Sequence, residues 1–418
     1  MKYIVLIGDG MADMPIKKLG YKTCLQKAST PNMDRIAAEG EPGSLKTIPS
    51  GFAPGSDVAN LSIFGYNPSK YFSGRAALEA AYRGVKLKPG DIAFRCNLVT
   101  LKFTGSKNRD NALMQDYSAG HISTRESTLL IKAINNKLGS DRIVFYPGMS
   151  YRHLMVWKKV KQKTHCTPPH DITGEKIKNY LPKGNGGSFL RELMEKSTEI
   201  LIAHPVNKKR IELGLPPANS LWFWGQGKSV YIPKFKEKYN LKGAVISAVD
   251  LIKGLGICAG FDVVPVKGAT GYLDTNYIGK ARAALRALES VDIVYLHVEA
   301  PDEASHNGSI KEKIKAIENF DAKVVGTVLK GIKKFKKYSI LLLPDHATPI
   351  SVKSHTDDPV PFVIYRSAGS DSHRGCRGKG MKNAKPEIKS FSEDICRARH
   401  LRVFKRGYKL MDYFIRGK

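Results

Sequence analysis

Three short runs of apolar residues in this chain stop abruptly at acidic residues. Residues 3–7 run into Gly-Asp-Gly, residues 293–298 run into Glu-Ala-Pro-Asp, and residues 339–343 run into Pro-Asp-His. Short continuous apolar runs are typical of strands that are buried on both faces of a parallel sheet. Ligands of open α/β sheets bind beyond the carboxyl ends of the strands, so the pattern predicts a site built from acidic residues at one sheet edge.

The segments between these runs show helical spacing. Apolar positions in residues 311–335 recur every three or four residues, which predicts a helix. Strands that alternate with helices in this way predict an α/β fold, with a mostly parallel sheet flanked by helices.

The middle of the chain has a different composition, with more residues that end helices and strands. Two Pro-Pro pairs and a glycine-rich stretch break it into short elements, which predicts a separate domain of α/β or α+β type. Because strand-end acids lie on both sides of this stretch, we expect it to be an insertion into one discontinuous domain. The expected boundaries place residues 1–88 and 275–418 in the discontinuous domain and residues 89–274 in the insert.

Length and composition are those of a soluble globular protein. The chain has 418 residues, of which 42% are hydrophobic and 25% charged, and these values exclude disordered, collagen-like and coiled-coil proteins. The six cysteines form neither a CxxC pair nor a zinc-binding spacing, so we expect reduced thiols. No run of about 18 uninterrupted apolar residues is present, and the first apolar run is too short for a signal peptide. These features predict a cytoplasmic protein with no membrane partner.

The net charge changes the set of partners to consider. Lys and Arg number 68 against 38 Asp and Glu, a surplus of +30 at pH 7, which favours anionic partners such as phosphorylated metabolites, nucleic acid or membrane surfaces. Specific nucleic-acid binding lacks further support, because the chain has no zinc-finger spacing, RNP-like strand or basic zipper. A weak, salt-sensitive association of the basic tail, residues 366–418, with RNA stays open.

Acidic residues and histidines gather at the predicted strand ends. Asp302 and His306, at positions i and i+4, reach the same side of a helical turn, and Asp345 and His346 adjoin at another strand end. A lone histidine is more often a surface residue than a ligand, but the joint pattern favours a metal site. Mixed carboxylates and imidazoles suit Mn²⁺, Zn²⁺ or Co²⁺ better than Ca²⁺. The candidate ligands are Asp9, Asp302, His306, Asp345, His346 and His355.

A serine stands at a glycine-flanked turn in the sequence Pro-Gly-Ser-Asp, residues 54–57. At the start of a predicted helix, Ser56 is either an N-cap residue, which is the ordinary case, or a nucleophile beside an anion-binding helix terminus. A serine hydroxyl that binds a metal can lose its proton and attack phosphorus, so a nearby metal site keeps the second alternative open.

Several arginines lie next to glycines or aromatic residues. A guanidinium group binds phosphate or carboxylate through two parallel hydrogen bonds, so a small dianionic substrate would use several of them. Each arginine alone could equally be a solvated surface residue. The candidates are Arg75, Arg83, Arg95 and Arg152.

Long sequence blocks carry a resemblance to a known family. They include IVLIGDGMAD, GSDVANLSIFGYNP, FSGRAALEA, YRHLMVW, SLWFWGQG, HVEAPDEASHNG and PDHATPI. In these blocks and their order, the chain resembles the archaeal-type cofactor-independent phosphoglycerate mutases of the alkaline phosphatase superfamily over nearly its whole length. It departs from that family near the C-terminus, where a basic segment at 396–406 stands in place of the expected glycine-rich stretch.

The resemblance implies two metal sites. Asp9, Ser56, Asp345 and His346 would form one site, and Asp302, His306 and His355 the other. The implied ions are divalent, with Mn²⁺ first and Zn²⁺, Co²⁺ or Mg²⁺ as alternatives.

The resemblance also implies a reaction, an isomerisation that belongs to glycolysis and gluconeogenesis. Ser56 would take the phosphoryl group from 3-phosphoglycerate and return it to the 2-hydroxyl of the retained glycerate, so no free 2,3-bisphosphoglycerate is needed. We expect Arg75, Arg95 and Arg152 around the substrate and His121 as a proton shuttle between the two glycerate hydroxyls. The insert would be the substrate-binding lid that excludes water.

Other functions of the same superfamily remain as alternatives. A phosphatase, a phosphodiesterase or a homoserine kinase-like phosphotransferase would keep the same metal ligands and differ in the insert. The sequence leaves open whether the protein is a monomer or a homo-oligomer.

Overall fold

A computed structural model describes residues 1–103, 111–161, 163–229, 231–367 and 388–417. The chain divides into two compact units. The first unit combines Met1–Phe72 with Tyr231–Lys418, and the second is the continuous segment Ser73–Val230.

The first unit is built on an eight-stranded, mostly parallel sheet, in the strand order β11-β10-β12-β1-β13-β14-β2-β15. At its centre β1 (Lys2–Gly8) pairs in parallel with β12 (Ile293–Val298) on one side and β13 (Tyr338–Leu343) on the other. These are the three predicted apolar strands, and nearly every residue in them is buried. The other strands are β2 (Glu41–Leu45), β10 (Gly243–Ile246), β11 (Asp262–Val263), β14 (Val360–Arg366) and β15 (Arg402–Phe404).

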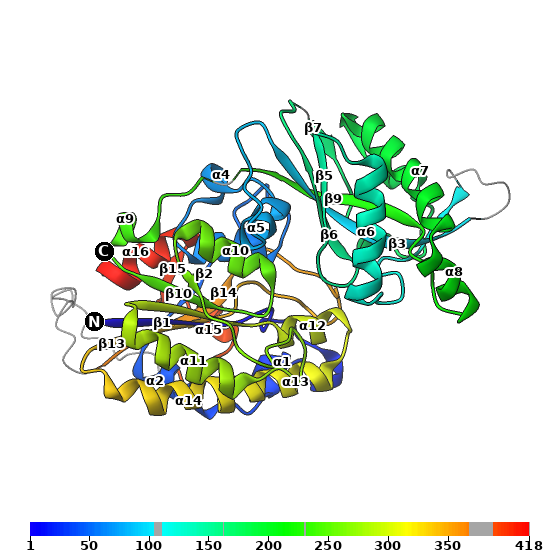
Figure 1. Ribbon diagram of the computed structural model, residues 1–418. Coiled ribbons are helices and arrows are strands. Elements are labelled where there is room, and N and C mark those ends of the chain that lie inside the picture. The colour runs from blue at the N-terminus through cyan, green and yellow to red at the C-terminus, as the bar shows by residue number, and fades with distance from the viewer. Residues whose placement is uncertain (104–110, 162, 230, 368–387, 418) are drawn as a thin grey trace. The chain divides into compact units, whose positions relative to one another are not determined.

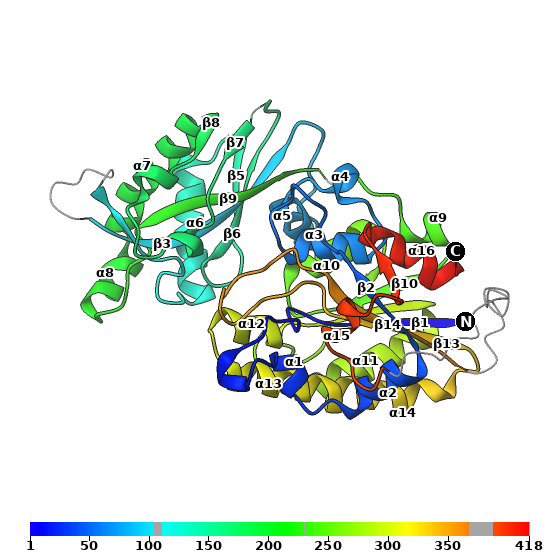
Figure 2. The same ribbon diagram turned by 180° about the vertical axis from the view of Figure 1, so that it is seen from behind.

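Helices cover both faces of this sheet, which confirms the predicted α/β class. Figure 1 shows α2, α11, α13 and α14 along one face and α10 and α16 along the other, and Figure 2 shows the same layers from behind, with α3 labelled on the second face. The helices of this unit are α1 (Cys24–Lys27), α2 (Pro31–Glu39), α3 (Ser56–Ile63), α4 (Pro68–Tyr71), α9 (Phe235–Tyr239), α10 (Asp250–Ala259), α11 (Tyr277–Ser290), α12 (Ala300–His306), α13 (Ile310–Asn319), α14 (Gly326–Gly331), α15 (Asp394–Arg397) and α16 (Leu410–Arg416).

The helix predicted over residues 311–335 is helical throughout most of that range but changes its winding. A π-helical turn, Phe320–Val325, separates α13 from α14. Asp321 in that turn accepts hydrogen bonds from the backbone N–H groups of Asn32 and Met33, at 3.3 and 2.7 Å. Since these N–H groups belong to the first turn of α2 and have no partner within it, the π turn caps a neighbouring helix.

The second unit has an antiparallel sheet and its own hydrophobic core. Its central strand β3 (Ile92–Lys102) pairs with β4, β6 and β9, and β5 pairs with β6. The other strands are β4 (Leu113–Asp116), β5 (Ile143–Tyr146), β6 (Arg152–Trp157), β7 (Lys163–His165), β8 (Lys183–Asn185) and β9 (Ser220–Lys228). The helices are α5 (Arg75–Tyr82), α6 (Thr124–Leu138), α7 (Gly187–Ala203) and α8 (Pro205–Glu212).

The two units correct the expected domain boundaries, which placed the insert at 89–274. The insert begins earlier, because α5 belongs with β3 and β9, and Glu79 of α5 forms an ion pair with Arg95 of β3. It also ends earlier, because β10 pairs in parallel with β12 and continues the sheet of the first unit.

The described part of the chain has free thiols and no membrane span. Cys24, Cys96, Cys166, Cys258 and Cys396 are free, and Cys376 lies outside the described residues. Within the described residues, every helix is too short or too polar to cross a bilayer.

Candidate active site

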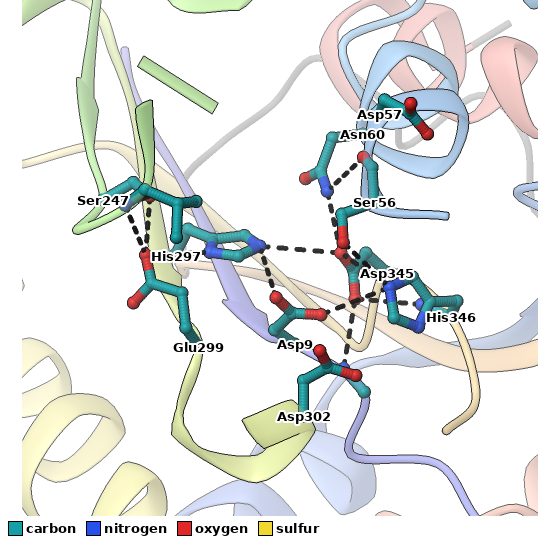
Figure 3. Close-up of polar contacts among 12 residues, drawn as sticks. Asp9, Ser56, Asp57, Asn60, Ser247, His297, Glu299, Asp302, Asp345 and His346 are labelled. Carbon is teal, nitrogen blue, oxygen red and sulfur yellow. Dashed lines mark hydrogen bonds and ion pairs between the residues drawn. The ribbon is translucent and has the colours of Figure 1, made fainter. Parts of the chain in front are cut away.

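The candidate ligands meet at the carboxyl edge of the central sheet. Asp9 follows β1, Asp302 and His306 lie on α12 directly after β12, and Asp345 and His346 follow β13. Because these strands are parallel and adjacent, their carboxyl ends share one edge. The structure therefore brings together in the first unit every ligand that the sequence proposed, as Figure 3 shows for several of them.

One group of ligand atoms comes from Asp9, Asp345 and His346, which are all buried. The three atoms lie within 4.8 Å of one another. His346 Nε2 is 3.3 Å from Asp9 Oδ1 and 3.6 Å from Asp345 Oδ2. Ser56 Oγ completes this group at 3.1 Å from the same nitrogen.

A second group comes from Asp302, His346 and His355. His306 joins it, because its Nε2 lies 3.1 Å from Asp302 Oδ2 and 3.1 Å from His355 Nε2. His346 thus lies between both groups, whereas the resemblance had assigned it to one site.

The electrostatics of the cluster fit divalent cations. Burial raises the pKa of Asp9 well above its usual range, and the negative charges of Asp345 and Asp302 raise it further. Asp9 Oδ1 is also buried, and it has no hydrogen-bond partner among the residues that the structure describes. A cation among these carboxylates would offset their mutual repulsion and would give Asp9 Oδ1 a partner. Oxygen and imidazole nitrogen ligands suit Mn²⁺, Zn²⁺ or Co²⁺.

Ser56 does not occupy the N-cap position, which was one of its two sequence interpretations. Gly55 is the N-cap residue of α3, and Ser56 is the first residue of the helix. Within the described residues, no side chain at the N-cap position caps this helix. Ser56 Oγ points instead toward His346, and the nucleophile role stays a prediction.

Asn60 supports this serine and was missed by sequence reasoning. It lies one helical turn after Ser56, and its Nδ2 donates to the backbone carbonyl of Ser56 at 2.8 Å and to Asp345 Oδ2 at 2.8 Å. Asn60 is fully buried, so its amide fixes the start of α3 against the carboxylate. Its position four residues after Ser56 was the sequence feature that could have indicated this contact, because residues i and i+4 lie on the same side of a helix.

A buried histidine on β12 was also missed. His297 Nε2 lies 3.5 Å from Asp9 Oδ2 and 3.5 Å from Asp345 Oδ2, and its Nδ1 lies 3.4 Å from Glu299 Oε1. Burial lowers the pKa of His297, but the nearby carboxylates of Asp345 and Glu299 outweigh it and raise the pKa to about 9. The signal in the sequence was a histidine inside an otherwise apolar strand.

Glu299 links this histidine to the interior of the unit. Its carboxylate accepts hydrogen bonds from Ser247 Oγ at 2.6 Å and from the backbone N–H of Ala248 at 2.7 Å. Lys280 Nζ, which is fully buried, donates to Glu299 Oε2 at 2.6 Å. A chain of alternating acidic and basic groups thus runs from the site into the core, from Asp9 and Asp345 through His297 and Glu299 to Lys280.

The predicted substrate arginines lie in the second unit and form a cluster around one acid. Arg95 Nε donates to Glu79 Oε2 at 3.1 Å, and Arg75 Nε lies 3.5 Å from Glu79 Oε1. The guanidinium of Arg95 stacks over the ring of Trp224 at 4.1 Å. Burial raises the pKa of Glu79, but the surrounding arginines, which include Arg152, lower it overall. Several guanidinium groups for one carboxylate leave a positive excess that suits an anion.

His121 lies in the same unit. It is exposed, with a φ of 48°, and its ring makes an edge contact with Tyr151 at 6.1 Å. The guanidinium of Arg152 lies over the same tyrosine ring at 5.1 Å. Tyr151 therefore contacts both His121, the candidate proton shuttle, and Arg152, a candidate substrate-binding residue.

Known proteins resemble this chain over most of its length. The model of a family described as 2,3-bisphosphoglycerate-independent phosphoglycerate mutase matches residues 37–207. A protein of that name from Methanosarcina acetivorans is 57% identical over 376 residues, which are 89% of this chain and 92% of the relative. A probable one from Geobacter sulfurreducens is 52% identical over 415 residues, 99% of this chain and 100% of the relative.

Solved structures agree with these relatives. A protein from Pyrococcus horikoshii is 30% identical, with a TM-score of 0.77, over 100% of this chain and 97% of that chain. A cofactor-independent phosphoglycerate mutase from Thermoplasma acidophilum is 26% identical, with a TM-score of 0.59, over 99% of each chain.

Proposed function

This chain belongs to the 2,3-bisphosphoglycerate-independent phosphoglycerate mutase family and interconverts 3-phosphoglycerate and 2-phosphoglycerate, and we propose that the phosphoryl group passes through Ser56. The observation that carries this proposal is the place of Ser56. Its hydroxyl makes no capping hydrogen bond and lies 3.1 Å from His346 Nε2, within the buried cluster of carboxylates and imidazoles.

The same cluster supports a pair of divalent ions. Asp9, Ser56, Asp345 and His346 would hold one ion, and Asp302, His306 and His355 the other. When bound, such ions neutralise the phosphoryl oxygens and favour the deprotonated serine hydroxyl. We propose Mn²⁺ as the ion, with Zn²⁺, Co²⁺ and Mg²⁺ as alternatives that the same ligands accept.

The transfer consists of two displacements at phosphorus. Ser56 Oγ attacks the phosphoryl group of 3-phosphoglycerate, a new Oγ–P bond forms, and the bond from the 3-oxygen to phosphorus breaks. The 3-oxygen takes up a proton. The glycerate then reorients, its 2-hydroxyl loses a proton and attacks phosphoserine, and Ser56 is restored. Because the glycerate itself returns to the phosphoserine, free 2,3-bisphosphoglycerate is not required.

The second unit supplies the groups that hold and protonate the glycerate in this proposal. Arg75, Arg95 and Arg152 bind its carboxylate, and Glu79 orients two of these guanidinium groups. His121 carries the proton between the 2- and 3-oxygens. The role of this unit as a lid that excludes water stays a prediction; without such exclusion, phosphoserine would be hydrolysed and the protein would act as a phosphatase.

The direct test is a mutase assay on full-length protein stripped with EDTA, with Mn²⁺, Zn²⁺, Co²⁺ and Mg²⁺ added back singly. We expect interconversion of the two phosphoglycerates without added bisphosphoglycerate once a suitable ion is present. Stoichiometric release of inorganic phosphate instead would contradict the proposal.

The Ser56→Ala variant tests the nucleophile in the same assay. We expect turnover to be lost while Mn²⁺ still binds, because the other ligands remain. An exposed serine of the same unit, Ser290, provides the matched control as Ser290→Ala. Appreciable mutase activity in Ser56→Ala would remove this serine from the reaction.

A further inference from the structure

We infer that the hydroxyl of Thr348 is a positioning group that fixes both His346 and Asp302, and so links the two groups of candidate ligands. This inference rests on the proposed function, since it assumes that these groups bind divalent ions. Thr348 lies in the sequence block PDHATPI, two residues after His346, and it is fully buried. None of the steps assigned to the reaction uses it.

The hydrogen-bond geometry assigns the protons. Thr348 Oγ1 donates to Asp302 Oδ1 at 2.6 Å. A hydroxyl has a single proton, and a carboxylate only accepts, so this proton is committed to Asp302. Thr348 Oγ1 also lies 3.1 Å from His346 Nδ1. In that contact the hydroxyl oxygen must accept, and His346 must therefore carry its proton on Nδ1.

This tautomer leaves the useful nitrogen of His346 free of a proton. Its Nε2 lone pair faces Ser56 Oγ at 3.1 Å and Asp9 Oδ1 at 3.3 Å, where a ligand nitrogen is needed. The opposite tautomer would place an N–H there and could not bind a cation. One hydroxyl thus sets the chemical state of a histidine in the group that contains Asp9 and Asp345.

The same hydroxyl sets the orientation of Asp302. Because Oδ1 of Asp302 accepts from Thr348, the carboxylate plane is held with Oδ2 toward His306 Nε2, at 3.1 Å. Asp302 belongs to the group with His355, and not to the group with Asp9. Thr348 therefore contacts one candidate ligand in each group, His346 in the group with Asp9 and Asp302 in the group with His355.

The backbone holds Thr348 in place for this role. Its N–H donates to the carbonyl of Ala12 at 3.1 Å, and its own carbonyl accepts from Lys313 Nζ at 2.9 Å. Gly10 leaves the space that the contact requires, because a Cβ there would lie 2.7 Å from Thr348 Oγ1 and 2.5 Å from Asp302 Oδ1. The threonine hydroxyl is consequently confined between its two partners.

Other supporting contacts each reach only one of the two groups of candidate ligands. His306 Nδ1 lies 2.9 Å from the backbone carbonyl of Lys353, and Asn60 donates to Asp345. Loss of Asn60 should disturb the Asp9 and Asp345 group alone. Loss of the Thr348 hydroxyl should disturb both groups, and this difference makes the inference testable.

The first experiment is a calorimetric titration of Mn²⁺ into EDTA-stripped, full-length protein. We expect two binding events in the wild type, and weaker affinity for both in Thr348→Val, by about 10–100-fold. Thr348→Ser keeps the hydroxyl and should bind nearly as the wild type does. Asn60→Ala should weaken one event only.

The second experiment observes the imidazole directly. Long-range ¹⁵N NMR of the metal-free protein should show the His346 proton on Nδ1 in the wild type and in Thr348→Ser, and a mixture of tautomers in Thr348→Val. A purely structural role of Thr348 in packing would not change this signature.

The outcomes separate the inference from the proposed function. Unchanged Mn²⁺ affinity in Thr348→Val, equal losses in Thr348→Ser and Thr348→Val, or a wild-type His346 proton on Nε2 would each overturn the role of Thr348. A wild-type protein that binds fewer than two Mn²⁺ ions would instead contradict the two-ion proposal, while the NMR result would still test the hydroxyl.

Discussion

Buried histidines in this protein differ according to the charges beside them. Carboxylates surround His297 and raise its pKa to about 9 in spite of its burial. His153 on β6 is equally buried, but burial lowers its pKa to about 3, and the positive charge of Arg83 contributes in the same direction. His153 Nδ1 accepts a hydrogen bond from the Gly148 N–H at 2.9 Å, as a neutral ring can. The carboxylates favour the charged form of His297, whereas burial favours the neutral form of His153.

The state of His153 predicts a pH dependence of stability. Between pH 6.5 and about 3 the unfolded chain binds a proton at this histidine and the folded chain does not, so stability falls with falling pH by up to about 1.4 kcal/mol per unit. His153→Asn keeps an acceptor for Gly148 but cannot ionise, and it should flatten this slope. Urea unfolding followed by tryptophan fluorescence at pH 4 to 7 measures it.

The matched control is the exposed His165 of β7, changed to Asn. That variant should retain the pH slope of the wild type. If His153→Asn and the wild type lost stability in parallel as the pH fell, His153 would not be the group responsible.

Strand ends explain how much of the site the sequence could predict. An apolar run that ends at an acidic residue is a local pattern that indicates a strand end, so the sequence alone predicted Asp9, Asp302 and Asp345 as site residues. Asn60, His297 and Thr348 are single polar residues whose partners come from other segments, and only the parallel order of β12, β1 and β13 brings those partners close. Such contacts follow from the fold and leave no local pattern.

Element length explains the error in the insert boundaries. The strand β10 has four residues and β11 has two, so each run is too short to be distinguished from a loop by its apolar pattern. Their membership of the main sheet follows from their pairing with β12 and with each other. The helix α5, at the other boundary, is joined to β3 through the pair of Glu79 and Arg95.

A buried ion pair joins Lys280 of α11 to Glu299, the residue that follows β12, and this predicts a large effect of one substitution. Lys280→Met should lower the free energy of unfolding by about 3–5 kcal/mol, because Glu299 would keep a buried charge without its ammonium partner. Urea unfolding of the metal-free protein, followed by far-UV circular dichroism, measures the change.

A second lysine–glutamate pair provides the control. Lys334 and Glu289 form an exposed pair, with 45% and 60% of their side chains accessible. Lys334→Met should leave the stability nearly unchanged, because solvent screens an exposed pair. Equal losses in the two variants would show that burial does not set the strength of the Lys280 pair.

At the scale of the whole molecule, the two units have separate cores. The core of the second unit contains Phe94, Leu130, Leu190 and Trp222, all from within Ser73–Val230. The three tryptophans of the chain, Trp157, Trp222 and Trp224, also lie in this unit. Tryptophan fluorescence therefore reports on the second unit alone.

This separation predicts that the second unit folds by itself. A fragment of residues 73–230 should unfold cooperatively in urea, with a tryptophan fluorescence change like that of the full chain, because its apolar contacts are internal. Trp222→Phe should reduce the signal without abolishing the transition. A fragment with no cooperative transition would contradict the prediction.

The central place of β1 has a consequence for synthesis on the ribosome. This strand precedes the insert in the chain, yet its neighbours β12 and β13 follow the insert. The insert can fold as soon as it has emerged, while the apolar strand β1 stays unpaired until β12 and β13 have been made. A nascent chain stalled before residue 293 should therefore carry a folded insert together with an exposed strand that chaperones can bind.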